Sequence, residues 1–220
     1  MIDWQILPGE RTELYSPVGL RPVDEMTGAT PLGGVRVDLD VSDESGGWRT
    51  TGISPVITTS GVIIFPALER RSEVVGRPAR RFRIRLTADF YQPLYRASSE
   101  GIEFDAFPFN DANPPQVIAS QIQDAFLTPA TNYPFQAHIP VLRGDVRDAS
   151  GVRVADVLVM EGARERVLTD ERGAFALPLR WAPKNGAVAI NATDQRNNRA
   201  GAININVPAD LRNNHTIVIT

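Results

Sequence analysis

Cysteine is absent from this 220-residue chain, which excludes disulfides, thiolate nucleophiles and cysteine-based zinc or iron–sulfur sites. Histidine, the usual general base near neutral pH, occurs only as His138 and His215, and neither has a partner at metal-ligand spacing. No apolar run approaches the ~20 residues that span a bilayer, and the N-terminus shows no signal-peptide pattern. We therefore expect no metal, no cofactor, no membrane contact, and folding in the cytoplasm.

Other catalytic signatures are also missing. The chain has no G-x-S-x-G nucleophile elbow and no G-x-x-x-x-G-K-[ST] phosphate loop. Asp38, Asp40, Asp43 and Glu44 form an acidic cluster, but a calcium loop starting at Asp38 would need Gly and Glu where Asp43 and Arg49 stand. The cluster fits a solvated strand end better than a cation site. Glycoside hydrolysis needs two carboxylates that lie close together in space. The sequence does not single out such a pair, although residues far apart in the chain could form one. We predict that the chain is not an enzyme.

What the chain does contain is the pattern of a β protein. Hydrophobic residues make up 42%, enough for packed cores, and the net charge of −3 gives no general attraction to nucleic acid. Apolar and polar residues alternate over residues 33–41 and 81–88, and shorter strand-like runs, separated by glycine turns, continue to the C-terminus. We predict an all-β fold with two small antiparallel β-sandwich modules, residues 1–106 and 137–220.

Residues 107–136 between these modules are rich in proline and aromatic residues. Proline disfavours helix before it, so the segment should be stiff and extended. A short helix over residues 115–126 is the alternative, because apolar residues recur there near helical spacing. A freely solvated linker would not need aromatic rings, so we expect them to pack on the modules or on a neighbouring subunit. The five rings are Phe107, Phe109, Phe126, Tyr133 and Phe135.

Arginine is concentrated between residues 70 and 85. The residues singled out as interface candidates are Arg70, Arg71, Arg81, Arg83 and Arg85. The last three fall on one face of a predicted strand, opposite apolar residues. This face is either an electrostatic dock for an acidic partner subunit or a solvated sheet face. Stacking aromatics are missing on that face, so we do not expect a nucleic-acid partner.

The two halves share an order of features. Each contains a turn, a strand, a T-x-x-G turn, another strand and an alternating strand; the T-x-x-G-type turns are at residues 58–61 and 169–173. The glycine supplies the positive φ that a tight turn requires. This order indicates one small sandwich used twice, although any two β domains share some strand–turn rhythm.

The second half resembles the carboxypeptidase regulatory-like domains. The residues behind this are G-D-V-R-D-A-S-G at 144–151 and T-D-E-R-G-A-F at 169–175, which are similar to the G-x-V-x-D opening and the T-D-x-x-G-x-F signature of that family. The resemblance covers residues 137–220 and implies a non-catalytic, transthyretin-like sandwich of about seven strands. The first half departs from the pattern, with Ser60 and Val62 at the acidic and aromatic positions.

The whole chain also resembles proteins encoded among the tail genes of double-stranded DNA bacteriophages. Stretches at residues 16–21, 67–71, 104–111 and 132–135 carry this likeness. It implies a non-enzymatic component of the virion, in the tail, baseplate or neck, which forms symmetric homo-oligomers and contacts other virion proteins.

Two other functions stay open at this point. A carbohydrate-binding or host-adhesion module would use exposed aromatic rings, with Trp48, Tyr91, Tyr95 and Trp181 as candidates. An accessory domain of a bacterial surface system is the third possibility, which an upstream signal sequence would support.

Overall fold

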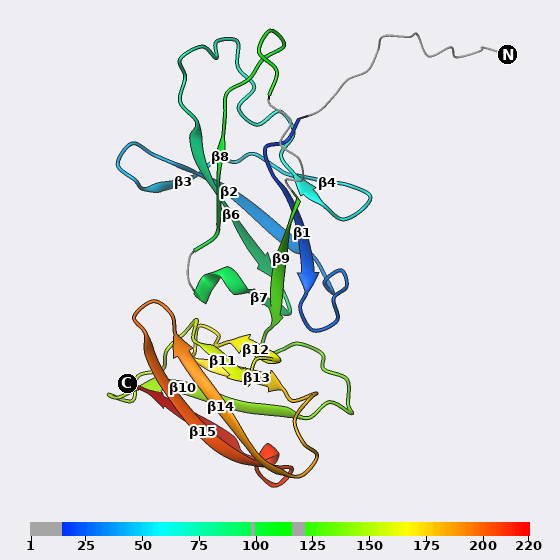
Figure 1. Ribbon diagram of the computed structural model, residues 1–220, viewed down its shortest axis with the longest axis vertical. Coiled ribbons are helices and arrows are strands. Elements are labelled where there is room, and N and C mark those ends of the chain that lie inside the picture. Colours follow the sequence, from blue (N-terminus) through cyan, green and yellow to red (C-terminus); the bar gives the residue numbers. More distant parts are fainter. Residues whose placement is uncertain (1–14, 98–99, 116–121) are drawn as a thin grey trace, which may run out of the picture.

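A computed structural model describes residues 15–97, 100–115 and 122–220. The chain forms two β modules stacked along the long axis of the molecule, with the N-terminal module above the C-terminal one in Figure 1. The described part contains strands, two short 3-10 helices and no α-helix. The prediction of an all-β fold with two sandwich-like modules is confirmed.

The N-terminal module contains nine strands and one 3-10 helix. In chain order these are β1 (Gly19–Asp24), β2 (Val35–Ser42), β3 (Trp48–Thr50), β4 (Val56–Ile57), β5 (Ile63–Ile64), β6 (Arg80–Ala88), β7 (Tyr91–Pro93), η1 (Leu94–Ala97), β8 (Ile102–Ala106) and β9 (Ile122–Pro129). They join edge to edge in the order β3-β2-β6-β7-β9-β1-β5-β4, with β8 also paired to β6.

The C-terminal module contains seven strands. These are β10 (Val141–Asp148), β11 (Leu158–Glu161), β12 (Glu165–Leu168), β13 (Ala174–Pro178), β14 (Gly186–Asp194), β15 (Arg199–Val207) and, after the 3-10 helix η2 (Ala209–Arg212), β16 (Asn214–Ile219). They form two sheets, β13-β10-β16 and β12-β11-β14-β15, which face each other across the core.

The two modules share one topology. The first strand of each lies between an antiparallel and a parallel neighbour: β1 between β5 and β9, and β10 between β13 and β16. The second strand pairs antiparallel with a short strand and a long one, β2 with β3 and β6, and β11 with β12 and β14. The long strand then pairs with β8 or β15. The internal repeat inferred from the sequence is present as this shared strand order, to which the N-terminal module adds β4 and β7.

The predicted glycine turns have one geometry in both modules. The N–H of Thr58 donates to Val62 O, and the N–H of Val62 donates to the Thr58 hydroxyl at 3.0 Å. In the turn that starts at Asp170, the N–H of Asp170 donates to Ala174 O, and the Asp170 carboxylate accepts from the N–H of Ala174. The fourth residue is glycine with φ near +77° and +70°, a backbone conformation that glycine adopts without strain. Turns starting at Asp43 and Asp148 repeat the arrangement.

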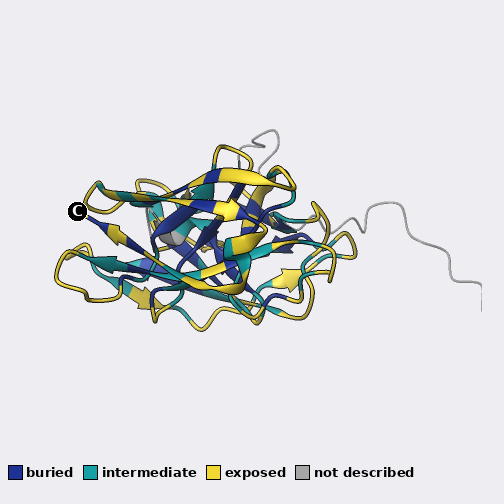
Figure 2. Cartoon of the chain, turned by 90° about the horizontal axis from the view of Figure 1, so that it is seen from below, coloured by how far each residue is buried: buried dark blue, intermediate teal, exposed yellow. Residues whose placement is uncertain are grey.

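Alternation along the strands builds the cores. On β6, Phe82, Ile84 and Leu86 are buried and face the N-terminal core. Each contributes about 1.5–3 kcal/mol by leaving water. A separate core fills the C-terminal module, and Figure 2 marks the buried residues of the strands in dark blue. A third small cluster, in which Leu94 and Met160 pack on Leu158 and Leu168, joins the two modules.

Part of the expected linker belongs to the N-terminal sheet. Residues Ile122–Pro129 form β9, which pairs in parallel with β1 and antiparallel with β7. Ala125 and Leu127 point into the core, whose apolar contacts outweigh the low strand propensity of the proline-rich surroundings. The alternative of a helix over residues 115–126 is wrong for 122–126; residues 116–121 lie outside the described part.

Candidate functional site

The described residues form an open groove on the N-terminal module. It holds about 740 Å³ and lies between β1, the loop that leads to β2, and the β4–β5 turn. Its lining residues are Arg21, Pro22 and Val23 of β1, residues 28–35 of the loop, Ile57, Ser60, Gly61 and Ile63 around the turn, and Asp124 of β9. We call this feature the groove.

The groove begins where the pairing of β1 with β5 stops. Leu20 faces Ile63, and the pairing ends there. Proline follows at position 22, and proline has no N–H to donate to a neighbouring strand. In the C-terminal module, the position equivalent to Pro22 is Val146, whose N–H donates to Gly173 O at 2.9 Å. The proline therefore explains why the edge of β1 is open at position 22, whereas two positions further on Asp24 N–H donates to Ala29 O at 2.9 Å.

An ion pair crosses the sheet at the groove. Arg21 Nε lies 2.7 Å from Asp124 Oδ1, and the two side chains are 56% and 36% exposed. The hydrogen bond to Arg21 lowers the pKa of Asp124, and the same bond raises the pKa of Arg21. Because both side chains reach solvent, the pair contributes little to stability. It leaves a fixed pattern of one positive and one negative group for anything that enters the groove.

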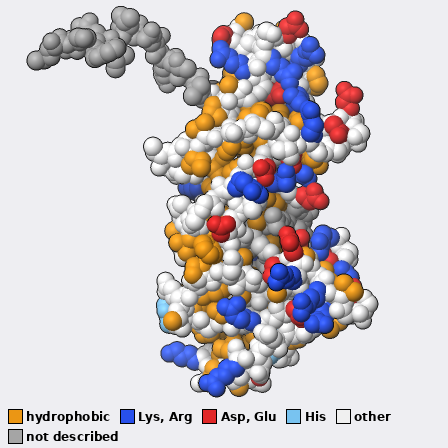
Figure 3. Space-filling model, turned by 180° about the vertical axis from the view of Figure 1, so that it is seen from behind, with side chains coloured by type: hydrophobic (Ala, Val, Ile, Leu, Met, Phe, Trp, Pro, Cys, Tyr) orange, Lys and Arg blue, Asp and Glu red, His pale blue; other side chains and the backbone are white. Residues whose placement is uncertain are grey.

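Apolar side chains stand exposed around the groove. Ile57 is 61% exposed and Val56 is 49% exposed on β4, and Ile122 and Phe126 are 55% and 43% exposed on β9. In Figure 3, hydrophobic side chains gather along the side of the N-terminal module. Of these four exposed residues, Ile57 lines the groove itself.

The five linker aromatics have different surroundings. Tyr133 is buried, its hydroxyl donates to Asp24 Oδ2 at 2.8 Å, and Phe135 packs against its ring. Phe109 is 8% exposed, while Phe107 and Phe126 stay largely exposed. Tyr133, Phe135 and Phe109 thus pack within the N-terminal module. Of the five rings, only Phe107 and Phe126 present a free face.

The predicted arginine face is paired with the chain's own carboxylates. Asp40 of β2 is 2% exposed; its Oδ2 lies 2.9 Å from Arg83 Nη2 and 2.7 Å from Arg85 Nε. Burial alone would raise the pKa of Asp40, but the hydrogen bonds from Arg85, Arg83 and Thr50 lower it to about 2. The solvated-face interpretation fails at Arg83, which is 8% exposed. An acidic partner would have to displace carboxylates already in place.

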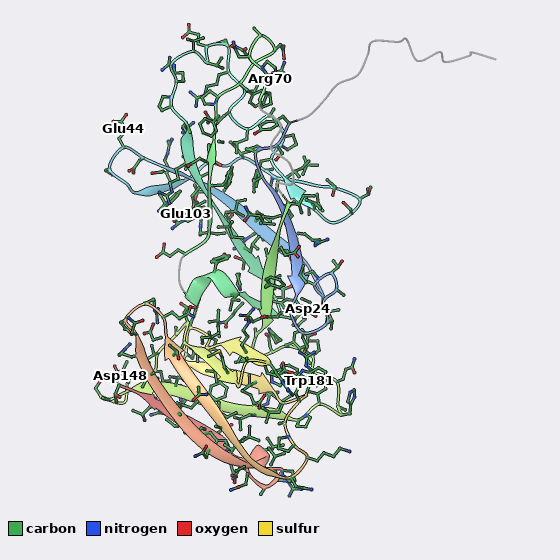
Figure 4. All side chains as sticks on the ribbon, in the orientation of Figure 1. Asp24, Glu44, Arg70, Glu103, Asp148 and Trp181 are labelled. Atoms are coloured by element: carbon green, nitrogen blue, oxygen red, sulfur yellow. The ribbon has the colours of Figure 1, made fainter. Side chains whose placement is uncertain are left out.

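The remaining arginine candidates also have partners. Arg81 pairs with Glu103 at 2.5 Å, and Arg70 pairs with Asp111 at 2.7 Å. Arg71 lies 2.8 Å from Glu69. In Figure 4, Arg70 lies at the end of the N-terminal module that is far from the C-terminal module, and Glu103 lies on β8. The candidates are therefore spread over several local ion pairs.

The two histidines and the acidic residues near Asp43 lie in separate local environments. His138 is exposed, and His215 Nε2 lies 2.8 Å from Asp210 O. Asp43 caps its turn, with its carboxylate accepting from the N–H of Gly47. Across the described ranges, no three His, Asp or Glu side chains gather in a way that could hold a metal ion.

The aromatic residues considered for sugar binding do not form a platform. Tyr91 is buried, and the hydroxyl of Tyr95 donates to Leu86 O. The Trp48 ring lies under the Arg83 guanidinium, with 4.6 Å between Arg83 Cζ and the ring centroid. Trp181 is 60% exposed on the C-terminal module. Of these four rings, only Trp181 is well exposed for stacking.

Polar contacts lock the two modules together. Arg180 Nε lies 2.6 Å from Glu165 Oε1, and another nitrogen of the same guanidinium donates to Met26 O in the N-terminal module. Arg166 pairs with Glu25 at 2.5 Å. The Gln92 side chain donates to Thr169 O at 3.3 Å. These contacts surround the apolar cluster at the junction and hold the two modules in one orientation.

Neither the groove nor the junction was found from the sequence. The one available signal for the groove was Pro22 inside an apolar run before a glycine-rich loop, because a proline in a strand marks an unpaired edge. The junction contacts join residues far apart in the chain, from 77 positions for Gln92 and Thr169 to 154 for Met26 and Arg180, and no local sequence pattern indicates them.

No family model matches the chain, and no curated protein matches it. Among similar solved structures are a streptococcal ancillary pilin, at 11% identity and a TM-score of 0.30, and BcpA, the major pilin subunit of Bacillus cereus, at 9% and 0.25. A C-terminal fragment of the pilus adhesin SpaC from Lactobacillus rhamnosus GG matches at 11% and 0.22. Each likeness covers 92% of this chain, and respectively 62%, 68% and 95% of the other.

The phage interpretation is corrected by this comparison. The chain was expected to be a bacteriophage tail, baseplate or neck protein located in the virion, whereas the solved structures found are bacterial pilins and a pilus adhesin. This chain spans 62% of the length of the streptococcal pilin. In the described residues, no helix is long and apolar enough to cross a membrane.

Proposed function

We propose that this chain is a non-enzymatic structural protein that binds other subunits, and that the groove side of its N-terminal module is the contact surface. The observation that carries the proposal is the hollow beside β1, which opens at Pro22 and has the exposed side chain of Ile57 in its lining. Pro22 limits strand addition at this edge, so the apolar hollow, which receives the side chains of a partner, provides the contact.

The buried acids support a structural role rather than proton transfer. Asp40 and Asp194 are held by pairs of arginines, and hydrogen bonds from these arginines outweigh burial and lower both pKa values to about 2. A carboxylate that stays ionised far below neutral pH is a poor proton donor in catalysis. It stabilises the fold by accepting several hydrogen bonds.

The contacts at the junction fix the position of the loop that follows β1. Because Arg180 and Arg166 tie the C-terminal module to residues 25 and 26, the loop that begins beside them is held from both sides. That loop forms one wall of the groove. A rigid two-module rod suits a repeated assembly, and we propose that copies of the chain associate with each other.

The setting that we propose is the accessory domain of a bacterial surface system. The kinship of residues 137–220 with carboxypeptidase regulatory-like domains likewise remains a prediction. Protease digestion of intact cells tests the setting directly: a surface protein is cleaved without lysis, and protection of the chain in intact cells would contradict it.

Substituting one apolar residue at the rim of the groove tests the contact surface. Ile57→Asp places a charge in the proposed interface and should weaken self-association at least about tenfold, measured by light scattering after size-exclusion chromatography across a concentration series. Val152→Asp is the matched control, because Val152 is also 61% exposed but lies on the C-terminal module. Equal effects of the two substitutions, or a parent chain that stays monomeric throughout, would refute the proposal.

A further inference from the structure

The hairpin of β4 and β5 gives the N-terminal module a sheet edge that the C-terminal module does not have. β4 is the last strand of its sheet and pairs only with β5. In the C-terminal module, β13 takes the place of β5, and β13 is itself the last strand of its sheet. In Figure 1, β4 stands at the side of the N-terminal module. Among the described residues, β4 is therefore an edge strand whose outer side is available to another chain.

The backbone of Ile57 presents a donor and an acceptor on this outer side. Antiparallel strands alternate between residue pairs that exchange two hydrogen bonds and pairs that exchange none. The N–H of Thr58 donates to Val62 O at 2.9 Å, so Thr58 and Val62 form a hydrogen-bonded pair. The next pair, Ile57 and Ile63, is therefore not hydrogen-bonded, and the N–H and C=O of Ile57 point away from β5. These two groups can bond to a strand that approaches β4 from outside.

The side chains at this edge are apolar and exposed. Ile57 is 61% exposed, Val56 is 49% exposed, and Ile53, just before the strand, is 45% exposed. Single exposed apolar residues are ordinary, but these three are neighbours in the chain at one unpaired edge. Edge strands that avoid association usually carry charged side chains, and β4 carries none.

The lack of charge around β4 favours a second copy of this chain as the partner. Residues 50–68 contain no Asp, Glu, Lys or Arg. The charged residues in the lining of the adjacent groove are Arg21 and Asp124, which pair with each other. In a two-fold contact every residue meets its own equivalent, so a charged edge would repel itself. This edge meets no like charge in a second copy, and it offers no opposite charge to a strongly charged partner.

We propose that β4 pairs antiparallel with β4 of a second copy, around a two-fold axis at Ile57. The N–H of each Ile57 then donates to the C=O of the other, and the sheets of the two N-terminal modules join edge to edge. Because Ile57 also lines the groove, the two Ile57 side chains pack together at the rim of both grooves. This inference rests on the proposed function and names the partner.

The residues around Ile57 limit the pairing to one position on each chain. Outward-pointing backbone groups recur every second residue, so the next ones belong to Pro55 and Thr59. Pro55 has no N–H to donate, and Thr59 lies in the turn after β4. The backbone therefore fixes the register at Ile57, while the apolar side chains provide most of the contact. A two-fold contact of this kind closes on itself, so the expected product is a dimer and not a fibre.

Mixing two variants of the full chain tests the two-fold axis. Ile57→Asp alone and Ile57→Lys alone should each raise the dissociation constant of self-association at least about tenfold, because like charges meet on the axis. An equimolar mixture of the two variants should associate at least about threefold more tightly than either alone, because opposite charges then meet. Val152→Asp and Val152→Lys are the controls, since Val152 is equally exposed on the C-terminal module, and mixing them should change nothing. A mixture of the Ile57 variants that associates no better than either one would overturn the inference.

A backbone substitution tests the hydrogen bonds at the axis. Ile57→Pro removes an N–H that β4 does not use within its own sheet, and proline is tolerated at such positions of edge strands. Ile57→Ala removes a similar amount of side-chain contact but keeps the N–H. Both variants should melt at similar temperatures, while Ile57→Pro should associate at least about threefold more weakly than Ile57→Ala. Equal dissociation constants for two folded variants would contradict the pairing.

The outcomes separate this inference from the proposed function. The chain has no cysteine, so Ile57→Cys carries a single thiol. Paired residues on the axis have Cα atoms about 5.5 Å apart, within disulfide range, so oxidation in air should link two copies faster than it links Val152→Cys. If Ile57→Asp weakens association but the mixture shows no recovery and both thiol variants link at one rate, the contact surface stands and the two-fold pairing falls. A parent chain that stays monomeric would refute both.

Discussion

The two modules have the same strand order, but the edge of the first strand is fully paired in only one of them. In the C-terminal module, β10 is paired on both edges, and residues 152–154 continue the pairing past the end of β13. In the N-terminal module, Pro22 and the loop after β1, whose Leu32 N–H donates to the Tyr91 hydroxyl, leave the equivalent edge open. The same strand order is therefore closed at this edge in one module and open at Pro22 in the other.

The largest expected effect lies at the position where the modules differ most in side-chain size. Gly144 is equivalent to Leu20, and a Cβ at Gly144 would lie 2.2 Å from His215 O and 2.8 Å from the Phe175 ring. Gly144→Ala should lower the free energy of unfolding by about 3–5 kcal/mol, measured by urea denaturation. Gly34→Ala, where no atom lies within 4 Å, should change it by less than about 0.5 kcal/mol. Similar values for both substitutions would contradict the close approach of β10 and β16.

Loss of a buried carboxylate should cost more in the N-terminal module than in the C-terminal one. Asp40→Ala leaves Arg83, whose side chain is only 10% exposed, without its buried partner, and should cost about 3–5 kcal/mol. Asp194→Ala leaves Arg196 and Arg199, which are 45% and 33% exposed and can be rehydrated, so about 1–2 kcal/mol is expected. Urea denaturation of both variants checks the order, and the reverse order would contradict this account of the arginine network.

Acid should weaken both modules through these same two groups. The folded pKa of each aspartate, about 2, lies below the ordinary value of about 3.9, so their stabilisation is fully present above pH 4 and is lost as the pH falls towards 2. Each group should contribute about 2 kcal/mol to that loss, followed by urea midpoints between pH 5 and 2. Asp40→Asn should flatten this dependence; an unchanged slope would contradict the assignment.

The smallest of these effects is expected at the junction between the modules. Arg180→Ala leaves Glu165, whose side chain is 4% exposed, without its ion-pair partner and should cost about 2 kcal/mol. It should also let the two modules unfold in separate calorimetric transitions. Arg166→Ala, at a pair 42% and 21% exposed, should cost less than about 1 kcal/mol and leave one transition. A single transition in the Arg180 variant would show that the apolar cluster suffices to couple the modules.

Much of the fold could be predicted because it depends on local patterns. Alternation around Phe82, Ile84 and Leu86 fixed one face of β6, and the T-x-x-G and D-x-x-G turns have the expected positive-φ glycines. The strand β9 could not be predicted, because its place beside β1 depends on pairing across about 100 residues. For the same reason the arginine stripe was predicted as a surface, although Asp40 on the adjacent strand β2 buries part of it.

By itself the sequence determined which residues alternate, where the turns fall, and that the same order of elements occurs twice. The tertiary structure alone decided which edges are paired, which carboxylate each arginine meets, and where the groove lies. The physical reason is that alternation and turn chemistry act between residues that are neighbours in the chain. A groove exists only where segments distant in the chain approach each other, and here the pairing of β1 with β5 ends at Leu20, just before Pro22.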